Sequence, residues 1–334
     1  MLGRPSRISE ITTMKTTMNP IFKAVMLFAL PAGILVSCDS KKNDGGATKE
    51  KTQIKVTAEP KVVPTGMPFV EFNRQFLDLL AQKDLMQSAL TNKVGKLCEH
   101  LDTKLLDQML KLAAEGPQDG LSEDNWLLAY NQLMAIAGMR FGGDAAEAFY
   151  RLAADKNAPS VMRDYASQHY LRTESRVLTQ MRSSTDKETS RVHLQQVLDK
   201  AGTMASDIKE EAGTLPGAVL MGLAALSMTY EKNSEEFTLI QKKVVQLAMP
   251  VLENKSGHGD SMVCAAMQAL SRLQVDEAGP LIWEVAMDES LTTQMRLSAI
   301  GSLGPFSESV DVESLREKCK GDQKLKEALA MSVR

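Results

Sequence analysis

The chain has 334 residues and a formal net charge of −3, with 43% hydrophobic, 24% charged and 5% aromatic residues. This composition excludes a wholly disordered chain, and 21 Gly and 12 Pro exclude a collagen-like or low-complexity one. Residues 1–65 carry more Lys and Arg than Asp and Glu, so the rest of the chain is more acidic than the total. An acidic body argues against a nucleic-acid partner, because such binding depends on clustered Lys and Arg.

The N-terminal region has the features of an export signal. Lys15 and Lys23 precede an apolar run over residues 24–37. The run is shorter than the roughly 20 residues that a bilayer span needs, and small residues precede its end. These features predict a signal peptide over residues 1–37.

The signal ends in a cysteine. Leu-Val-Ser-Cys at residues 35–38 resembles the bacterial lipobox, which is an aliphatic residue, a permissive position, a small residue and the cysteine. The resemblance implies cleavage after Ser37 and acylation (palmitate or a similar fatty acid) at Cys38, which would anchor the protein to a membrane. Met14 and Met18 are alternative start positions.

Residues 38–65, from the cysteine onward, are polar, rich in Lys and almost free of large apolar side chains. We interpret this stretch as a disordered linker between the lipid and the body. Asp39 resembles an inner-membrane retention signal of enteric bacteria, but the rule is unreliable outside that group. The expected location is therefore the cell envelope, with the periplasmic or surface face left open.

The body has helical periodicity. Apolar residues recur every three or four positions from residue 68 on, and no segment alternates as a strand does. One predicted face comprises Phe69, Phe72, Phe76, Leu79 and Leu80, and a second comprises Leu97, Leu101, Leu105, Met109 and Leu112. A third predicted helix covers residues 126–139, with Ser122 as its N-cap.

Two segments of the body align with each other. Residues 148–170 match residues 281–303 at an offset of 133, close to four units of 33. The alignment pairs Asp155 with Asp288 and Arg163 with Arg296. A third, degenerate copy covers residues 247–273.

Each copy reads as helix, short polar turn, helix. This resembles a HEAT repeat, in which an Asp in the turn and an Arg early in the second helix interact along the stack. The resemblance implies an all-α fold, an α-α superhelix with a binding surface. We assign residues 145–334 to HEAT-like repeats and residues 66–144 to an N-terminal helical region of open repeat type, with a tetratricopeptide-like array or an irregular bundle as alternatives.

Short patterns that resemble catalytic motifs lack their partner elements. Gly-Asp-Ser at residues 259–261 is similar to the nucleophile block of SGNH-type hydrolases, but their Asp-x-x-His motif does not follow. Ser-x-x-Lys matches at residues 184–187 and 206–209 lack the companion motifs of penicillin-binding enzymes. We interpret Asp260 or Ser261 as a helix N-cap and predict no catalytic residue and no cofactor.

The histidines and cysteines form no metal-binding pattern. The four His never pair four residues apart, and we expect His100 and His169 on solvated or half-buried helix faces. Cys98, Cys264 and Cys319 fit no Cys-x-x-Cys pair, and we interpret them as small buried residues. A Cys98–Cys264 or Cys264–Cys319 disulfide is the open alternative.

Large side chains in the body have two interpretations. Seven methionines lie among apolar positions and are expected to fill the core, with a plastic partner-binding groove as the alternative; they are Met134, Met139, Met221, Met228, Met249, Met267 and Met287. Trp126, Tyr130 and Trp283 are candidates either for the core or for anchors on a partner surface.

These features together predict a membrane-anchored envelope lipoprotein. We expect a non-catalytic module that binds a protein or peptide partner, or acts as a scaffold, through a helical-repeat surface. Two alternatives stay open: an enzyme on a helical toroid with an unidentified carboxylate site, and a purely structural envelope protein.

The lipid anchor is testable at a single atom. Replacing Cys38 with Ser removes the thiol that would be acylated, so we expect the protein to leave the membrane fraction and to lose labelling by a fatty-acid probe. Persistent membrane association of C38S would show that the apolar run itself is retained as the anchor.

Overall fold

The computed structural model describes residues 67–82, 86–118, 120–184, 186–206 and 215–332, all within one unit, Val63–Arg334. The predicted signal peptide, Ser37, Cys38 and the linker to residue 65 lie outside the described residues. Within the described residues the secondary structure is helical and contains no strand, so the all-α prediction is confirmed.

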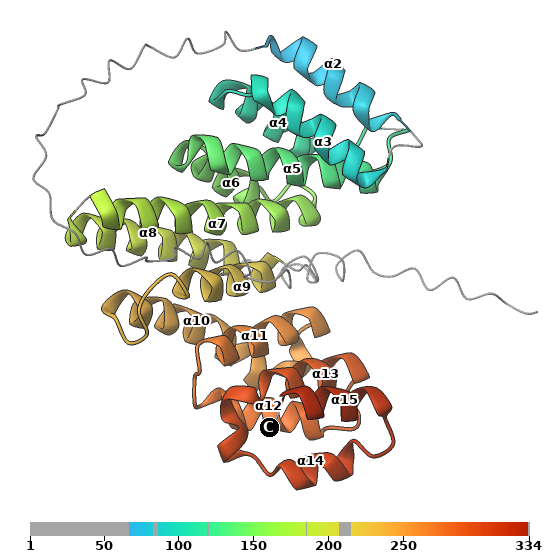
Figure 1. Cartoon of the computed structure of the whole chain (residues 1–334), viewed down its shortest axis with the longest axis vertical. Helices are drawn as coiled ribbons and strands as arrows, with labels where there is room; N and C mark the ends of the chain where they lie inside the picture. The colour runs from blue at the N-terminus through green and yellow to red at the C-terminus, as the bar shows by residue number, and fades with distance from the viewer. Residues whose placement is uncertain (1–66, 83–85, 119, 185, 207–214, 333–334) are drawn as a thin grey trace, which may run out of the picture. The chain divides into compact units, whose positions relative to one another are not determined.

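Fourteen α-helices and three short 3-10 helices make up the described chain (Figure 1). The α-helices are α2 (Phe69–Leu80), α3 (Gln87–Leu97), α4 (Thr103–Glu115), α5 (Glu123–Phe141), α6 (Gly143–Ala154), α7 (Ser160–Ser184), α8 (Lys187–Ser206), α9 (Leu215–Ser227), α10 (Glu235–Glu253), α11 (Asp260–Arg272), α12 (Ala278–Met287), α13 (Thr293–Ser302), α14 (Val312–Lys318) and α15 (Gln323–Ser332). The 3-10 helices are η1 (Cys98–His100), η3 (Lys255–Gly257) and η4 (Gly304–Ser309). None of the described helices is long and apolar enough to cross a membrane.

Several helices begin at a side chain that accepts a backbone N–H. Ser122 caps α5 as predicted, with its Oγ 3.4 Å from the amide nitrogen of Asn125. Asp102 caps α4, because its Oδ1 accepts from the amide of Leu105 at 2.7 Å. The predicted continuous face from Leu97 to Leu112 is therefore wrong. The chain turns through η1, and Asp102 starts a new helix.

The N-cap predicted at Asp260 or Ser261 is also wrong. Helix α11 begins at Asp260, and its N-cap is Gly259, which has no side chain to accept a hydrogen bond. The Asp260 carboxylate instead accepts a hydrogen bond from Thr292 Oγ1 at 2.9 Å. Thr292 is itself the N-cap of α13, so this bond joins the starts of two neighbouring helices.

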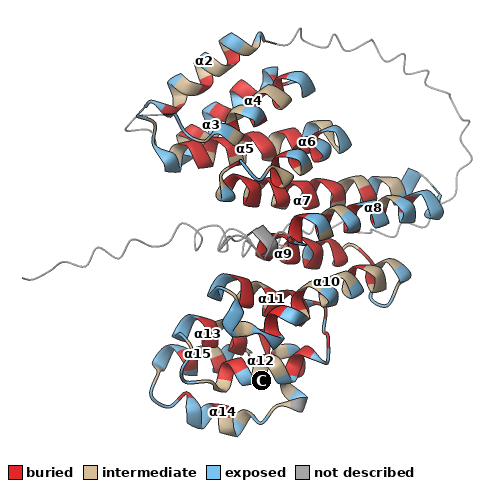
Figure 2. Ribbon diagram, turned by 180° about the vertical axis from the view of Figure 1, so that it is seen from behind, coloured by how far each residue is buried: buried red, intermediate tan, exposed pale blue. Residues whose placement is uncertain are grey.

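The helices are arranged in two layers. Each odd-numbered helix from α3 to α13 packs against the next odd-numbered one, and each even-numbered helix from α2 to α12 packs against the next even-numbered one. Successive helices pair as hairpins from α2–α3 to α12–α13, and α14 and α15 extend the two layers. Buried residues lie along the sides where the helices meet (Figure 2). The same alternation runs through residues 66–144, for which the sequence left the repeat type open.

Close packing within the odd layer depends on glycines. A Cβ on Gly138 of α5 would lie 2.4 Å from Thr173 Oγ1 of α7, and one on Gly222 of α9 would lie 2.5 Å from Leu171 Cδ1 of α7. Non-bonded contacts of a Cβ are essentially never this short, so a larger residue at either position would force the neighbouring side chain to move.

Two hairpins have the same turn. Arg163 Nε donates to the carbonyl of Ala153 at 3.0 Å, and Arg296 Nε donates to the carbonyl of Ala286 at 3.1 Å. Both guanidinium groups are buried, and each satisfies a carbonyl at the end of the preceding helix, where no intrahelical donor exists. Arg296 also reaches the carbonyl of Lys318, in the next helix pair, at 3.3 Å.

The two aspartates of the alignment occupy matching positions at the ends of α6 and α12. Asp155 Oδ1 accepts from the amide of Asn157, and Asp288 Oδ1 accepts from the amide of Ser290, each at 3.0 Å. They therefore stabilise equivalent turns. Identity as a HEAT repeat stays a prediction.

The repeat length predicted from the alignment is wrong. The offset of 133 residues leads from the hairpin α6–α7 to the hairpin α12–α13, which are three hairpins apart and not four. The intervening units are longer than 33 residues because α7 and α8 have 25 and 20 residues. Only the last step, from Ala266 of α11 to Ala299 of α13, equals 33 residues.

Candidate functional site

The exposed side of α5, α7 and α9, together with the turn that follows α9, combines two arginines with methionines. We call this set the Arg–Met surface, and it comprises Met139, Arg172, Arg176, Met221 and Met228. Met139 and Met228 are 62% and 70% exposed, Arg172 is exposed, and Arg176 and Met221 are half-buried. The prediction that the seven methionines at apolar positions fill the core is therefore wrong for Met139 and Met228, whereas Met134 and Met267 are fully buried.

The glycine contacts bring these residues to one level of the stack. Gly138 meets Thr173, and Leu171 meets Gly222, so the end of α5, the middle of α7 and the second half of α9 lie side by side. A helix in the middle of a layer is covered by its two neighbours and by the other layer, which leaves one open side. The exposed residues of these three helices therefore share that side.

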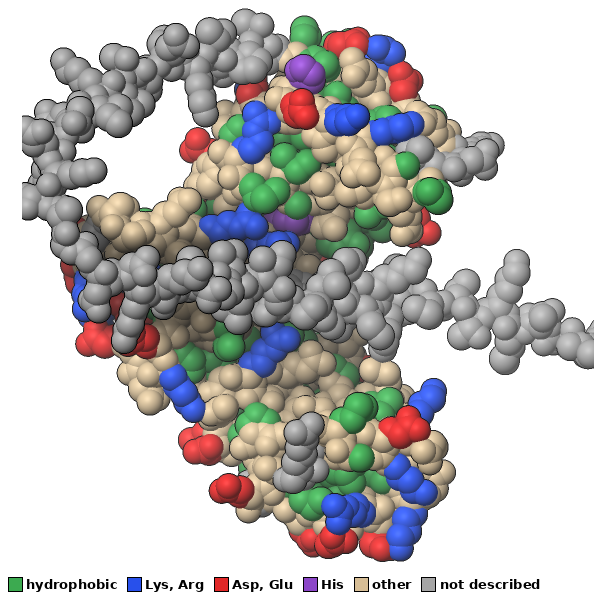
Figure 3. Space-filling model, in the orientation of Figure 1, with side chains coloured by type: hydrophobic (Ala, Val, Ile, Leu, Met, Phe, Trp, Pro, Cys, Tyr) green, Lys and Arg blue, Asp and Glu red, His purple; other side chains and the backbone are tan. Residues whose placement is uncertain are grey.

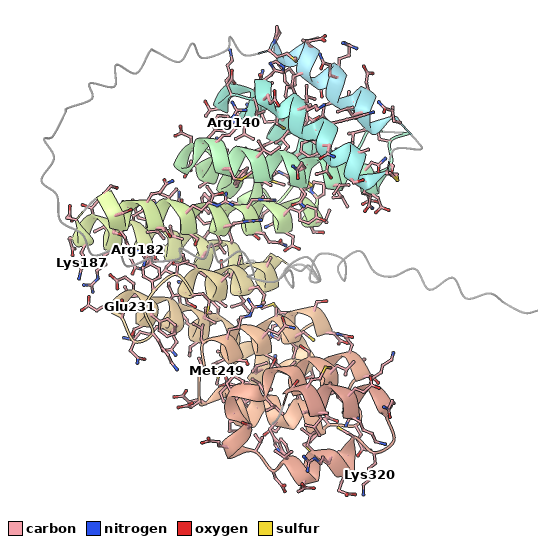
Figure 4. All side chains as sticks on the ribbon, viewed as in Figure 1. Arg140, Arg182, Lys187, Glu231, Met249 and Lys320 are labelled. Carbon is pink, nitrogen blue, oxygen red and sulfur yellow. The ribbon has the colours of Figure 1, made fainter. Side chains whose placement is uncertain are left out.

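Arg172 and Arg176 differ from two other arginines of α5 and α7, whose guanidinium groups are hydrogen-bonded to backbone carbonyls. Arg140 donates to the carbonyl of Cys98, and Arg182 donates to the carbonyl of Thr229 at 2.7 Å with its guanidinium 4.3 Å from the Tyr230 ring centre (Figure 4). Among the described residues Arg172 and Arg176 have no such partner. Burial, followed by the charge of Arg172, lowers the pKa of Arg176.

Acidic residues are scarce on the odd helices. Two of the acids on these helices are buried, three lie in the first turn of a helix, and one lies on α15. They are, in that order, Asp164 and Glu174; Glu123, Asp124 and Asp260; and Glu327. The even helices carry most of the acids of the stack. In Figure 3, outside the grey atoms, basic and hydrophobic side chains occupy the middle of the visible face and acidic ones lie towards its edge. The two arginines therefore create a local positive potential on an acidic protein.

His169 lies beneath these arginines. It is buried, contrary to the prediction of a solvated or half-buried position, and its Nε2 lies 2.7 Å from Asn131 Oδ1 of α5. Burial, followed by the charges of Arg172 and Arg176, lowers the pKa of His169 to about 3. The imidazole is therefore neutral at neutral pH, and the amide oxygen accepts the hydrogen bond from its ring N–H.

A second polar cluster joins α6, α7 and α8. His193 Nε2 lies 2.7 Å from Oε2 of the buried Glu174, and this hydrogen bond raises the pKa of His193 against the opposing effect of burial. Lys200 pairs with Glu147 and lies 4.8 Å from the Tyr150 ring centre. These bonds cross between helices, so the cluster fastens α8 to its neighbours.

The cavities on the described structure include the following three. One of about 350 Å³ lies between α2, the end of α4 and α5; one of about 430 Å³ lies between α2 and α3; and one of about 630 Å³ lies beside α10, where Met249 contributes to its wall (Figure 4). No group of three or more His, Cys, Asp and Glu side chains in the described ranges is arranged to hold a metal ion.

The cysteines of the body are free thiols. Cys98 and Cys319 are buried and Cys264 is half-buried, so the disulfide alternatives do not occur in this structure. Burial raises the pKa of the Cys98 thiol to about 12, despite the opposing charge of Arg140. The interpretation as small buried residues therefore holds for Cys98 and Cys319 and only in part for Cys264.

Of the three aromatic residues for which core and surface anchor were both open, two are buried in the core and one is half-buried. Trp126 and Tyr130 are 3% and 2% exposed, and Trp283 is partly buried against the core. Sequence reasoning missed Arg172, Arg176, Glu174 and His193 as candidate residues. Assigning each charge to an odd or even helix would have singled out the two arginines, but that assignment needs correct helix boundaries.

The buried His169 and the half-buried His193 predict opposite pH dependences of stability. His169 has a lowered pKa, so its stabilising effect is present above the unfolded pKa of about 6.5 and is lost as the pH falls towards 3. His193 has a raised pKa, so its effect is present below about 6.5 and is lost as the pH rises through its folded pKa. We expect H169Q to destabilise by about 1–3 kcal/mol more at pH 7 than at pH 5, and H193Q to destabilise more at pH 5 than at pH 8.

The pH dependence of each stability change is measured from the urea denaturation midpoints of both variants and the wild type at pH 5, 7 and 8. If both variants keep the pH dependence of the wild type, the assigned environments of the two histidines are wrong.

The comparisons with known proteins name no relative for this chain. No protein-family model matches it, and no curated protein matches it. A solved structure described as "Computational Design of Self-Assembling Cyclic Protein Homooligomers" is 16% identical and covers 79% of this chain and 94% of its own. Its TM-score of 0.16 is too low to carry an argument about fold or function.

Proposed function

We propose that the chain is a membrane-anchored envelope lipoprotein that binds a protein partner without catalysing a reaction. The signal-like segment and the lipobox-like residues 35–38 support the anchor, and they are a sequence argument. The helical-repeat body supports the binding role, since stacked hairpins present long continuous faces.

The Arg–Met surface is the observation that carries this proposal. Arg172 and Arg176 lie without a described partner beside two methionines that are more than half exposed. Arginine and methionine are enriched in interfaces, where a guanidinium forms charge-assisted bonds and a flexible thioether adapts to varied shapes. The partner chemistry that fits is an acidic segment with an apolar side, such as an amphipathic helix.

The buried Glu174 is paired with the half-buried His193, which makes this carboxylate a candidate for acid–base chemistry. Each member is bonded to the other across two packed helices, and neither lines the three cavities described above. This pairing favours a structural role over general acid–base chemistry.

The test removes two positive charges from the Arg–Met surface. Intact cells that produce the full-length chain are cross-linked, co-purifying proteins are identified by mass spectrometry, and the affinity of the main partner is then measured with purified proteins. We expect R172Q/R176Q to weaken binding about tenfold or more, because two interfacial charges lose their acidic partners.

The control is K104Q/K111Q, which removes two positive charges from exposed positions of the even helix α4. It should leave the affinity unchanged, and added salt should weaken the wild type more than R172Q/R176Q. Equal affinities for both double variants, or a preparation that yields no partner, would contradict the proposal.

A further inference from the structure

The cavity between α2, α4 and α5 has aromatic walls. Its volume is about 350 Å³, and Phe76, Trp126 and Tyr130 line it together with leucines. The Tyr130 ring centre lies 5.1 Å from that of Phe76 and 5.0 Å from that of Trp126, so the three rings support one another. A cavity of this size with apolar walls suits a small ligand that has an apolar stem. The packed rings also restrict the movement of the side chains in the wall.

The polar groups of the cavity favour positive charge. Glu115 lies at the exposed rim and ends α4, where the free carbonyls give the helix terminus a partial negative charge. Asn73 Oδ1 is buried and accepts no hydrogen bond from any residue in the described part of the chain. Among the described residues that line the cavity there is no Lys or Arg, and Gln118 completes the polar lining. Burial, followed by the Glu115 charge, raises the pKa of Tyr130, so its phenol stays neutral.

These groups identify the charge and the shape of a ligand. An anion would face the Glu115 carboxylate and the negative end of α4, and an uncharged apolar ligand would leave Asn73 Oδ1 without a donor. A primary ammonium supplies three donors and is attracted to aromatic rings, and its alkyl stem fits the leucine and aromatic walls. The cavity is also far larger than a bare ion needs.

We propose that this cavity binds the alkylammonium end of a lysine-like group. The site is built from α2, α4 and α5, uses none of the Arg–Met surface, and stands independently of the proposed function. Its ligand is either a lysine side chain of another protein or a free alkylamine, and both present the same ammonium group and stem.

The experiment uses the tryptophan in the wall as its reporter. The chain has two tryptophans, so W283F in the full-length protein leaves Trp126 as the sole indole. Its fluorescence is followed while n-butylammonium chloride is added at constant ionic strength, with n-butanol as the uncharged analogue. We expect a saturable change with n-butylammonium and a much weaker response to n-butanol.

Two variants in the W283F background locate the binding groups. E115Q should weaken n-butylammonium binding about fivefold, because it removes an exposed carboxylate. N73L, which keeps a similar volume, should weaken it about tenfold, because it removes the buried acceptor. E123Q removes an equivalent charge from the first turn of α5, outside the cavity lining, and should bind as W283F does.

A blocked lysine, Nα-acetyl-lysine methylamide, separates the two sources of the ligand. Binding as tight as that of n-butylammonium supports a lysine of a protein chain, and exclusion of the blocked lysine alone supports a free amine. The proposal is overturned if n-butylammonium gives no saturable change, if n-butanol binds equally well, or if E115Q and N73L bind as E123Q does.

Discussion

The close approach of every second helix is the constraint on which the rest of this structure depends. A hairpin buries one side of each of its helices and leaves the other side to its neighbours, so the stack forms only if successive odd helices can meet. Gly138 and Gly222 permit this on both sides of α7, because a larger residue would force the side chain of Thr173 or Leu171 to move. The buried arginines then fix the hairpins, since Arg163 and Arg296 bond to the carbonyls that end the preceding helices.

The layered arrangement also explains how the charges are distributed. Side chains of the even helices face solvent widely and carry most of the acids, whereas the odd helices have small or apolar residues where they meet. Arg172 and Arg176 therefore have no neighbouring acid on the next odd helix. Burial, followed by the charges of these two arginines, lowers the pKa of His169. The Arg–Met surface is thus a consequence of the packing pattern.

The sequence predicted the features that depend on neighbouring residues. Helical periodicity indicated the all-α class, Ser122 indicated the start of α5, and the spacing of Asp155 and Arg163 matched that of Asp288 and Arg296. Each of these features depends on residues within a single helix or hairpin. Such residues are close in sequence, so the pattern can be recognised without knowing the fold.

Features that depend on distant contacts were not predictable in the same way. An apolar spacing of four spans the break at Asp102 as readily as a continuous helix, so periodicity alone missed the turn. Whether Met139 is buried, and whether Asn131 reaches His169, depends on which helix packs alongside. The cavity between α2, α4 and α5 likewise brings together Asn73 and Glu115, and no pattern in the sequence indicates that these two residues are close.

The stability of Gly222→Ala tests the central constraint most directly, with Gly301→Ala as its matched control. Both glycines lie in helices, but a Cβ at Gly301 meets nothing within 4 Å. Denaturant unfolding should show G222A destabilised by about 1–2 kcal/mol, because overlap with Leu171 outweighs the gain in helix propensity, and G301A stabilised by about 0.5 kcal/mol. A neutral or stabilising G222A would contradict the close packing of α7 and α9 and the layered account built on it.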